Sequence, residues 1–183
     1  ANAHAALFGG GDDARQLSNP IASDLDALRP TPLPALLAAA GRNAARGLSN
    51  LSLFEIGPGF ASGMPEAQAA IAAGLRTGHA LRDWAKASHP ADAFDVKADM
   101  LAALEAVTGA PMSAPITRGA PGWYHPGRSG VIALGKNVIA QFGELHPKVL
   151  AAFDLKVPAA AFEIFLDAIP EAKQKGKARP LFA

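Results

Sequence analysis

Residues 131–142 contain two short runs rich in β-branched and aromatic side chains, separated by the loop Gly135-Lys136-Asn137. A short glycine-containing loop of this kind joins neighbouring antiparallel strands in a β-hairpin. Residues 161–166 have the same strand-forming composition. Because the hairpin fixes two strands as antiparallel neighbours, we expect an antiparallel sheet at the centre of the fold.

A further strand is predicted over residues 51–56, where apolar and polar residues alternate. We expect Leu51, Leu53 and Ile56 on one side of it, and we expect it to end at Gly57-Pro58-Gly59. Residues 65–78 leave two alternatives open: their alanines favour a helix, whereas Ile71, Ala73 and Leu75 could line one face of a strand. Residues 1–30 are expected to be mostly irregular, with a turn at Asn19-Pro20.

Three helices are predicted from apolar residues at helical spacing. The first begins near Thr31 and Pro32 and stops at Gly47, and the second spans residues 94–108 with Asp95 as its cap and Gly109 as its end. The apolar stripe of the second helix consists of Val96, Met100, Leu104 and Val107. A short third helix covers residues 147–153, with Pro147 at its first position and His146 at its N-cap. Helices and paired strands together predict an α+β fold.

Composition limits the number of domains and the classes of function. Half of the 183 residues are hydrophobic, but 42 of them are alanines, so the large apolar side chains suffice for one core. We expect one module over residues 1–170 and a separate basic segment over residues 171–183. The net charge of +1 gives no global attraction to nucleic acid or anionic membranes. Without a secretory signal or a long apolar run, the chain is expected to be cytoplasmic and to bind no membrane.

No catalytic, cofactor-binding or metal-binding residue is predicted. The sequence has no cysteine, and its five histidines do not form the close pairs typical of metal sites. Gly57-Pro58-Gly59 is not followed by the residues of a phosphate-binding loop. Ser129 lacks the glycine context of a serine nucleophile.

The densest cluster of unusual residues is Trp123-Tyr124-His125-Pro126-Gly127-Arg128-Ser129-Gly130. It could form a loop that faces a ligand or RNA, because aromatic faces and arginine suit bases and phosphates. The simpler alternative is a tight turn before the strand at Val131, in which His125 and Arg128 bond to nearby groups. His125, Gly127, Arg128 and His146 are the candidate motif residues. The basic run Lys173, Lys175, Lys177 and Arg179 could likewise contact RNA or form a solvated tail.

Several separate segments resemble, in order, the core of one known family. They are Asn19-Pro20-Ile21-Ala22-Ser23, Leu28-Arg29, Leu33-Pro34-Ala35-Leu36-Leu37, Asn43, Arg46, Phe54-Glu55-Ile56-Gly57, Phe94-Asp95-Val96-Lys97, His125-Pro126-Gly127-Arg128-Ser129, Phe142-Gly143-Glu144-Leu145-His146-Pro147 and Phe162-Glu163-Ile164. Over residues 17–166 this order resembles the catalytic-like core of the bacterial phenylalanyl-tRNA synthetase β subunit. Ala35 and Ala98 depart from it, since the family usually has glycine at both positions.

The resemblance implies a class II aminoacyl-tRNA synthetase-like antiparallel sheet flanked by helices, in an incomplete version, with a strand near residues 71–77. It also implies an excised core without catalytic function. A class II site needs arginines that stabilise phosphate charge, and neither a Phe-Arg-x-Glu nor a Gly-x-Gly-x-Glu-Arg pattern occurs here. This region is therefore expected to hold no cofactor, while the holoenzyme uses ATP and Mg²⁺.

The implied partners are the catalytic α subunit, in an (αβ)2 heterotetramer, and tRNA(Phe) through the holoenzyme. In this family the core packs on α through its first long helix and the adjoining strand. The candidate interface residues are Leu33, Leu36, Leu37, Ala40, Arg42, Asn43 and Arg46. Without the resemblance, an amphipathic helix of this kind would be expected to pack within its own domain. The alternative function is an independent RNA- or ligand-binding module that uses residues 123–130 and the basic tail.

Overall fold

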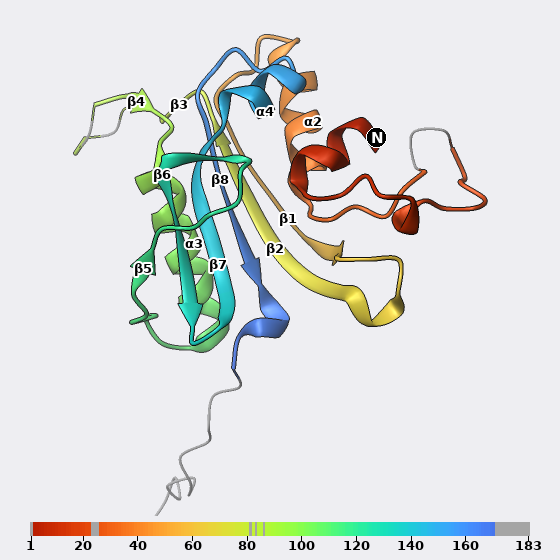
Figure 1. The fold of residues 1–183 in the computed structure, drawn as a ribbon. Helices are drawn as coiled ribbons and strands as arrows, with labels where there is room; N and C mark the ends of the chain where they lie inside the picture. Colours follow the sequence, from red (N-terminus) through yellow and green to blue (C-terminus); the bar gives the residue numbers. More distant parts are fainter. Residues whose placement is uncertain (1, 23–25, 81, 83, 86, 171–183) are drawn as a thin grey trace, which may run out of the picture.

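The structure is a computed structural model that describes residues 2–22, 26–80, 82, 84–85 and 87–170. Its centre is a six-stranded antiparallel sheet with the strand order β1-β2-β8-β7-β6-β5, and helices lie on both faces (Figure 1). A separate two-stranded ribbon pairs β3 with β4. The predicted α+β fold, an antiparallel sheet flanked by helices, is therefore confirmed.

The bounds of the described elements are as follows. The α-helices are α1 (Asn2–Ala5), α2 (Leu33–Ala44), α3 (Ala93–Thr108) and α4 (Pro147–Ala152). The strands are β1 (Leu51–Phe60), β2 (Gln68–Thr77), β3 (His79–Ala80), β4 (His89–Pro90), β5 (Ile116–Thr117), β6 (Tyr124–Leu134), β7 (Asn137–Leu145) and β8 (Ala159–Phe165). Short 3-10 turns occupy Ala6–Phe8, Asp13–Arg15, Pro65–Ala67 and Leu166–Ala168.

Strand β1 is longer than predicted, because it runs through Gly57-Pro58-Gly59 and pairs with β2 over its whole length. Proline is tolerated there since β1 forms an edge of the sheet and does not need every backbone donor for pairing. The predicted orientation of Ile56 is wrong. Leu51 and Leu53 pack against the core, whereas the alternation of the strand puts Ile56 on the other face.

The ambiguous segment is strand β2, which lies between β1 and β8. Ile71, Ala73 and Leu75 are buried on one face, as the strand alternative requires. Pairing on both sides outweighs the helical preference of the alanines, because propensity is a weak preference beside tertiary burial. The strand implied by the family resemblance is thus confirmed.

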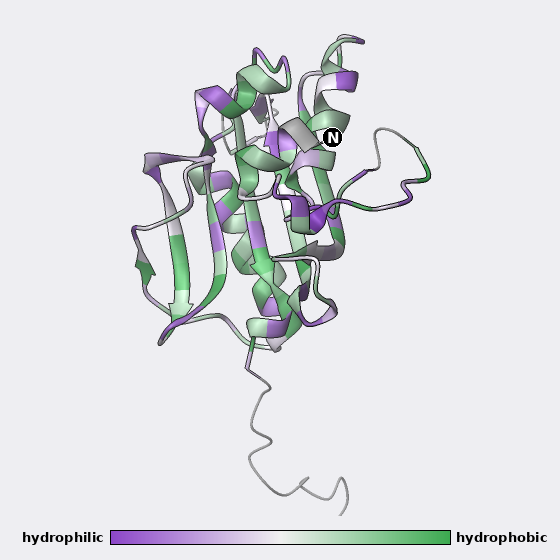
Figure 2. Cartoon of the chain, turned by 45° about the vertical axis from the view of Figure 1, so that its right-hand side comes forward, coloured by the Kyte–Doolittle hydropathy of each residue, from purple (hydrophilic) through white to green (hydrophobic). Residues whose placement is uncertain are grey.

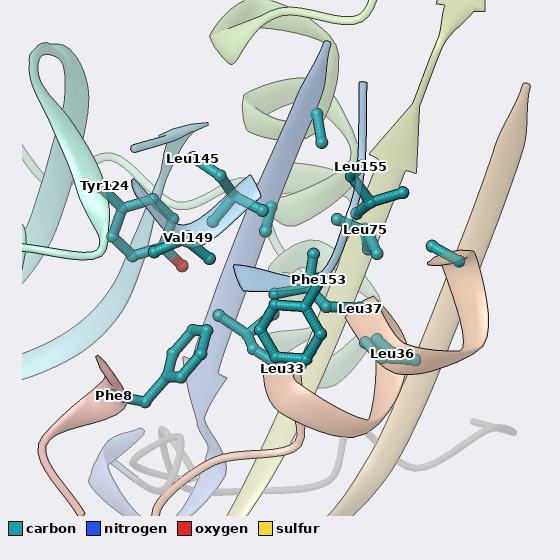
Figure 3. Packing of buried hydrophobic residues seen from close by; sticks show 14 of the residues in the cluster. Phe8, Leu33, Leu36, Leu37, Leu75, Tyr124, Leu145, Val149, Phe153 and Leu155 are labelled. Carbon is teal, nitrogen blue, oxygen red and sulfur yellow. The ribbon is translucent and has the colours of Figure 1, made fainter. Parts of the chain in front are cut away.

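The first core cluster lies on one face of the sheet, under α2 and α4 (Figure 3). Four residues of α2 are buried in it, namely Leu33, Leu36, Leu37 and Ala40. Phe8 packs into the same cluster and is only 2% exposed. The expectation of an irregular N-terminal region therefore missed both the short helical turns and a core residue.

The second core cluster lies on the opposite face, where α3 packs against β2, β7 and β8. Val96, Met100 and Leu104 are buried as predicted, but Val107 is 55% exposed in the last turn. Hydrophobic segments run along the strands at the centre of the sheet, and hydrophilic segments occur in the connections, on the helices and on parts of the strands (Figure 2). The two clusters make the sheet the middle layer of three.

The N-terminus of α3 differs from the prediction in its cap. Asp92 is the N-cap, and its side chain accepts hydrogen bonds from the backbone N–H groups of Phe94 and Asp95. The Asp95 carboxylate in turn accepts from the Asp92 N–H, which completes a capping box. Asp95 therefore supports the cap from the third helical position. The end of the helix at Gly109 is as predicted.

The predicted hairpin is β6 and β7, and both strands extend beyond their expected bounds. Leu134 pairs with Asn137, so the turn consists of two residues, with Gly135 at a φ of 63°. The segment from Tyr124 to Gly130 belongs to β6 and is not a loop; the register with β7 shifts between Tyr124 and Ser129. The predicted N-cap of α4 is confirmed, because the His146 side chain accepts from the Lys148 N–H.

Candidate functional site

A buried carboxylate, Glu163, lies near the centre of the sheet on β8 and is 1% exposed. Its neighbours across the sheet are Ala73 on β2 and Gln141 on β7, which places it on the α2 side. The carboxylate accepts hydrogen bonds from four side chains: Thr31 Oγ1, Gln141 Nε2 at 2.7 Å, Tyr124 OH at 2.9 Å and Trp123 Nε1 at 3.2 Å.

All four donors to Glu163 are neutral, and they come from three separate parts of the chain. Burial, followed by the nearby Glu163 charge and the hydrogen bond to it, raises the pKa of Tyr124 well above its usual value near 10. Tyr124 therefore stays protonated and donates. These hydrogen bonds hold two distant segments against β8. One is Thr31, just before α2, and the other is Trp123 and Tyr124 at the start of β6. The arrangement fixes the sheet and fills this face with the protein's own side chains.

The two aromatic residues of the 123–130 segment belong to this buried network. Trp123 and Tyr124 direct their polar atoms at Glu163, and Tyr124 is buried, so the pair does not form an exposed stacking surface. The sequence signal that could have revealed this is Glu163 itself, a carboxylate inside an otherwise apolar strand. An isolated acid in a buried strand requires donors, and the nearest unusual cluster supplies them.

The candidate motif residues lie close to one another around the β6–β7 pair. His125 Nδ1 accepts from the Gly127 N–H at 3.1 Å, and the His125 carbonyl accepts from Ser129 Oγ at 2.8 Å. Arg128 Nε lies 2.8 Å from Glu144 Oε2 on β7. These are the local bonds that the turn alternative expects, although the backbone around them is a strand. Binding of RNA or another ligand by this segment stays a prediction.

The predicted interface face of α2 is mostly inside the molecule. Its four apolar residues belong to the first core cluster, so they are not available to a partner unless that core opens. The Asn43 side chain donates to the Ala39 carbonyl at 2.8 Å. Arg42 and Arg46 are exposed. Contact with another subunit stays a prediction, and the residues that can make it without opening the core are Arg42 and Asn43 on α2 and Arg46 just after it.

A different apolar surface lies on β1. Phe54 is 79% exposed and Ile56 is 66% exposed, and both point to the α3 side of the sheet. Helix α3 packs on β2, β7 and β8 and leaves this part of β1 uncovered. Two large apolar side chains on one exposed strand face are typical of a surface that a partner covers. The prediction from the sequence missed this surface because it grouped Ile56 with Leu51 and Leu53, although strict alternation separates them.

The inner side of β1 is held by Arg29. Its Nη1 lies 2.6 Å from Glu55 Oε1, and its Nε donates to the Pro58 carbonyl at 3.0 Å. The Phe60 N–H donates to the Arg29 carbonyl at 2.9 Å. The segment before α2 therefore fixes the second half of β1, which keeps the strand in place while its outer residues stay exposed.

His89, Asp92 and Asp95 place potential metal-ligand atoms within 4.8 Å of one another, although no metal site is predicted from the sequence. Asp92 and Asp95 form the capping box of α3, and His89 Nε2 lies 3.1 Å from Asp95 Oδ1. The hydrogen bond to Asp95 raises the pKa of His89. Burial opposes the shift at Asp95, but the Asp92 N–H and His89 lower its pKa overall. The cluster therefore serves as a cap that ties the β3–β4 ribbon to α3.

Two further expectations concern membrane binding and the basic C-terminal segment. Among the helices of the described residues, none is long and apolar enough to cross a membrane. The basic run from Lys173 to Arg179 lies outside the described residues. The boundary between residues 1–170 and 171–183, like the role of the tail, thus stays a prediction.

Comparison with known proteins gives consistent similarities. A family model described as the phenylalanyl tRNA synthetase beta chain CLM domain matches residues 2–166. The chain is 54% identical over 175 residues to the phenylalanine–tRNA ligase beta subunit of Rhodospirillum rubrum, covering 94% of this chain and 22% of that protein. It is 50% identical over 179 residues to the corresponding subunit of Cereibacter sphaeroides, covering 97% of this chain and 22% of that protein. The chain thus spans about a fifth of the length of these relatives.

Solved structures give the same fold at low sequence identity. A crystal structure of pyrrolysyl-tRNA synthetase from Desulfitobacterium hafniense superposes with a TM-score of 0.63 at 12% identity, covering 90% of this chain and 57% of that one. A second structure of this synthetase gives a TM-score of 0.57 at 14% identity, covering 81% of this chain and 50% of that one. At such identities the likeness concerns the fold alone.

Proposed function

Since this chain belongs to the phenylalanyl-tRNA synthetase β-chain family, with a domain match over residues 2–166, we propose that it is a non-catalytic core of phenylalanine–tRNA ligase. In this role it supports the attachment of phenylalanine to tRNA(Phe) by packing against a catalytic α subunit in an (αβ)2 assembly. ATP and Mg²⁺ act at the catalytic subunit of that holoenzyme. We expect the assembly in the cytoplasm, where it serves translation.

The side chains that fill the α2 side of the sheet support the non-catalytic role. The α2 side of the sheet centre is filled by the Glu163 network and the first core cluster. Arg15 and Arg29, which lie on this side, bind protein groups: Arg15 donates to the carbonyls of Gly9 and Ala61, and Arg29 binds Glu55 and Pro58. Stabilisation of a phosphoryl or acyl intermediate needs donors aimed at an open position. These two arginines do not meet that requirement.

The observation that carries the packing role is the exposed pair Phe54 and Ile56 on β1. Interfaces of permanent assemblies are more apolar than the remaining surface, and their centres contain aromatic anchors. Strand β1 directly follows α2, so this surface corresponds to the strand that adjoins the first long helix. A partner covering it would remove two large apolar side chains from water without opening the core.

The test is association of the full chain with its α subunit. Replacing both residues, Phe54→Ala with Ile56→Ala, should raise the Kd for the α subunit by about 100-fold, as expected for central apolar anchors. The matched control is Val107→Ala, which removes an exposed apolar side chain at the far end of α3. The Kd comes from titration calorimetry, and the mass of the complex comes from analytical ultracentrifugation. An unchanged Kd for the double variant would contradict this interface.

A further inference from the structure

Three segments that are distant in the sequence line one cavity of about 330 Å³ on the α3 side of the sheet. They are the first turn of α3, the middle of β6 and the end of β7, and β5 closes the outer side. The family resemblance rests partly on these same segments. The packing role proposed for β1 does not use this cavity, because β1 and β6 lie toward opposite edges of the sheet (Figure 1).

The apolar wall of the cavity contains Phe94, Ile116 and Phe142. Phe142 is buried, whereas Phe94 is 76% exposed. Phe94 lies outside the face by which α3 packs on the sheet, since that face consists of Val96, Met100 and Leu104. Gly130 preserves the wall: a Cβ atom there would approach the Ile116 side chain to 2.7 Å and the Phe142 ring to 3.0 Å. The cavity thus presents an aromatic surface to solvent.

The polar wall contains two cations, Lys97 and Arg128, and within the described part of the chain only Arg128 is held in an ion pair. Arg128 is paired with Glu144, and the Asp92 side chain is used by the backbone N–H groups of α3. Lys97 lines the same cavity, is half-buried, and has no ion-pair partner among the described residues. A carboxylate of a partner can therefore pair with Lys97 without breaking an ion pair of this chain.

The charged residues that line the cavity indicate which class of molecule fits it. Lys97 and Arg128 face Asp92 and Glu144, so the wall carries equal numbers of cations and anions. A phosphate backbone requires a clear positive excess, which is absent here. A protein segment needs only an apolar side chain for the ring surface and one carboxylate for Lys97.

We infer that this cavity receives a segment of the α subunit in which an apolar side chain is followed closely by an aspartate or glutamate. The inference rests on the proposed assembly with that subunit. The apolar side chain lies against Phe94 and Ile116, and the carboxylate pairs with Lys97. The Arg128–Glu144 pair provides the polar rim. This docking site is separate from the Phe54 surface, since α3 lies between the two.

Photo-crosslinking in the assembled ligase tests the position of the partner. Phe94 is replaced with the photoreactive aromatic residue p-benzoylphenylalanine, because the site is exposed and already carries a ring. Irradiation followed by mass spectrometry should give a crosslink to an α-subunit peptide that contains an apolar residue beside an acidic one. The inference would be overturned by crosslinks found only within the β chain or only to tRNA, or by the absence of any crosslink.

Binding measurements test the proposed ion pair between Lys97 and a carboxylate of the α subunit. Lys97→Ala should raise the Kd for the α subunit by about 10-fold, and Lys97→Glu by about 100-fold, as expected for loss and reversal of a charge at an interface. The control is Lys136→Ala, an exposed lysine in the β6–β7 turn. Circular dichroism confirms that each variant is folded. If the wild-type chain binds α but Lys97→Glu binds equally well, this docking site is wrong and the packing role stands. If the wild-type chain does not bind α, both proposals are wrong.

Discussion

Tyr124 on β6 donates its phenolic hydrogen to the carboxylate of Glu163 on β8, and the two oxygens lie 2.9 Å apart on the α2 face of the sheet. Strand β7 lies between the two strands, so this bond reaches over a neighbour. Gln141 on that middle strand donates to the same carboxylate. The side chains therefore join three adjacent strands in addition to their backbone hydrogen bonds.

We expect Tyr124→Phe to lower the free energy of unfolding by about 1–3 kcal/mol, because a buried carboxylate loses one donor. The measurement is urea denaturation followed by circular dichroism. Ser52→Ala, on the exposed face of β1, is the control and should change the free energy of unfolding by less than about 0.5 kcal/mol. Equal stability of Tyr124→Phe and wild type would show that the bond contributes nothing.

The raised pKa of Tyr124 makes stability depend on alkaline pH. The folded state holds the phenolic proton to a higher pH than the unfolded state does, so the contribution is complete below the ordinary value near 10. It is lost as the pH rises above that value toward the folded pKa. Tyr124 is the only tyrosine of the chain, so its ionisation can be followed directly by near-ultraviolet absorbance. Tyrosinate absorbance that appears near pH 10 while the protein remains folded would contradict this prediction.

The His89–Asp95 contact predicts a histidine whose pKa lies above 6.5. A raised folded pKa means that the ion pair stabilises the protein below pH 6.5 and that this contribution is lost as the pH rises through the folded pKa. NMR titration of the His89 ring measures the value, and a His89→Gln variant identifies the signal. Asp95→Asn should lower the pKa of His89, whereas Asp99→Asn, on the same helix but paired with Arg76, should leave it unchanged.

The core position of Leu37 predicts a large loss of stability on truncation. Leu37→Ala should lower the free energy of unfolding by about 2–5 kcal/mol, because it leaves a cavity between α2 and the sheet. Arg46→Ala, at the exposed end of the same segment, should change it by less than about 0.5 kcal/mol. If Leu37→Ala left the stability of the chain intact and only weakened binding of α, then Leu37 would be an interface residue.

The elements with strong local signals are predictable from the sequence. Helices α2, α3 and α4 and the β6–β7 hairpin follow from apolar spacing, caps and a glycine turn. Strand β2 is not determined locally, because its alanines favour a helix and only pairing with β1 and β8 decides the outcome. Ile56 is misplaced because an apolar residue is expected on the core side, whereas strict alternation from Leu51 and Leu53 puts position 56 on the other face. The end of β1 is misplaced because Gly57-Pro58-Gly59 resembles a strand end, although an edge strand can continue through it.

The candidate sites are less predictable because they depend on contacts between distant residues. Trp123 and Glu163 are 40 positions apart, and their hydrogen bond turns a predicted loop into part of a buried network. The cavity beside Lys97 requires α3, β5, β6 and β7 to be placed together. The sequence identifies these segments as unusual, but it does not show which of them meet.

The contacts of Arg29 with β1 also affect the tendency of the chain to aggregate. An unpaired edge strand is a template on which a strand of another molecule can add, and this leads to aggregation. On β1, Pro58 has no N–H to offer, its carbonyl is bound by Arg29, and the Phe60 N–H is bound by the Arg29 carbonyl. Strand addition by a foreign chain is therefore blocked over the second half of β1. Phe54 and Ile56 can thus stay exposed on β1 while the second half of the same strand is closed to growth of the sheet.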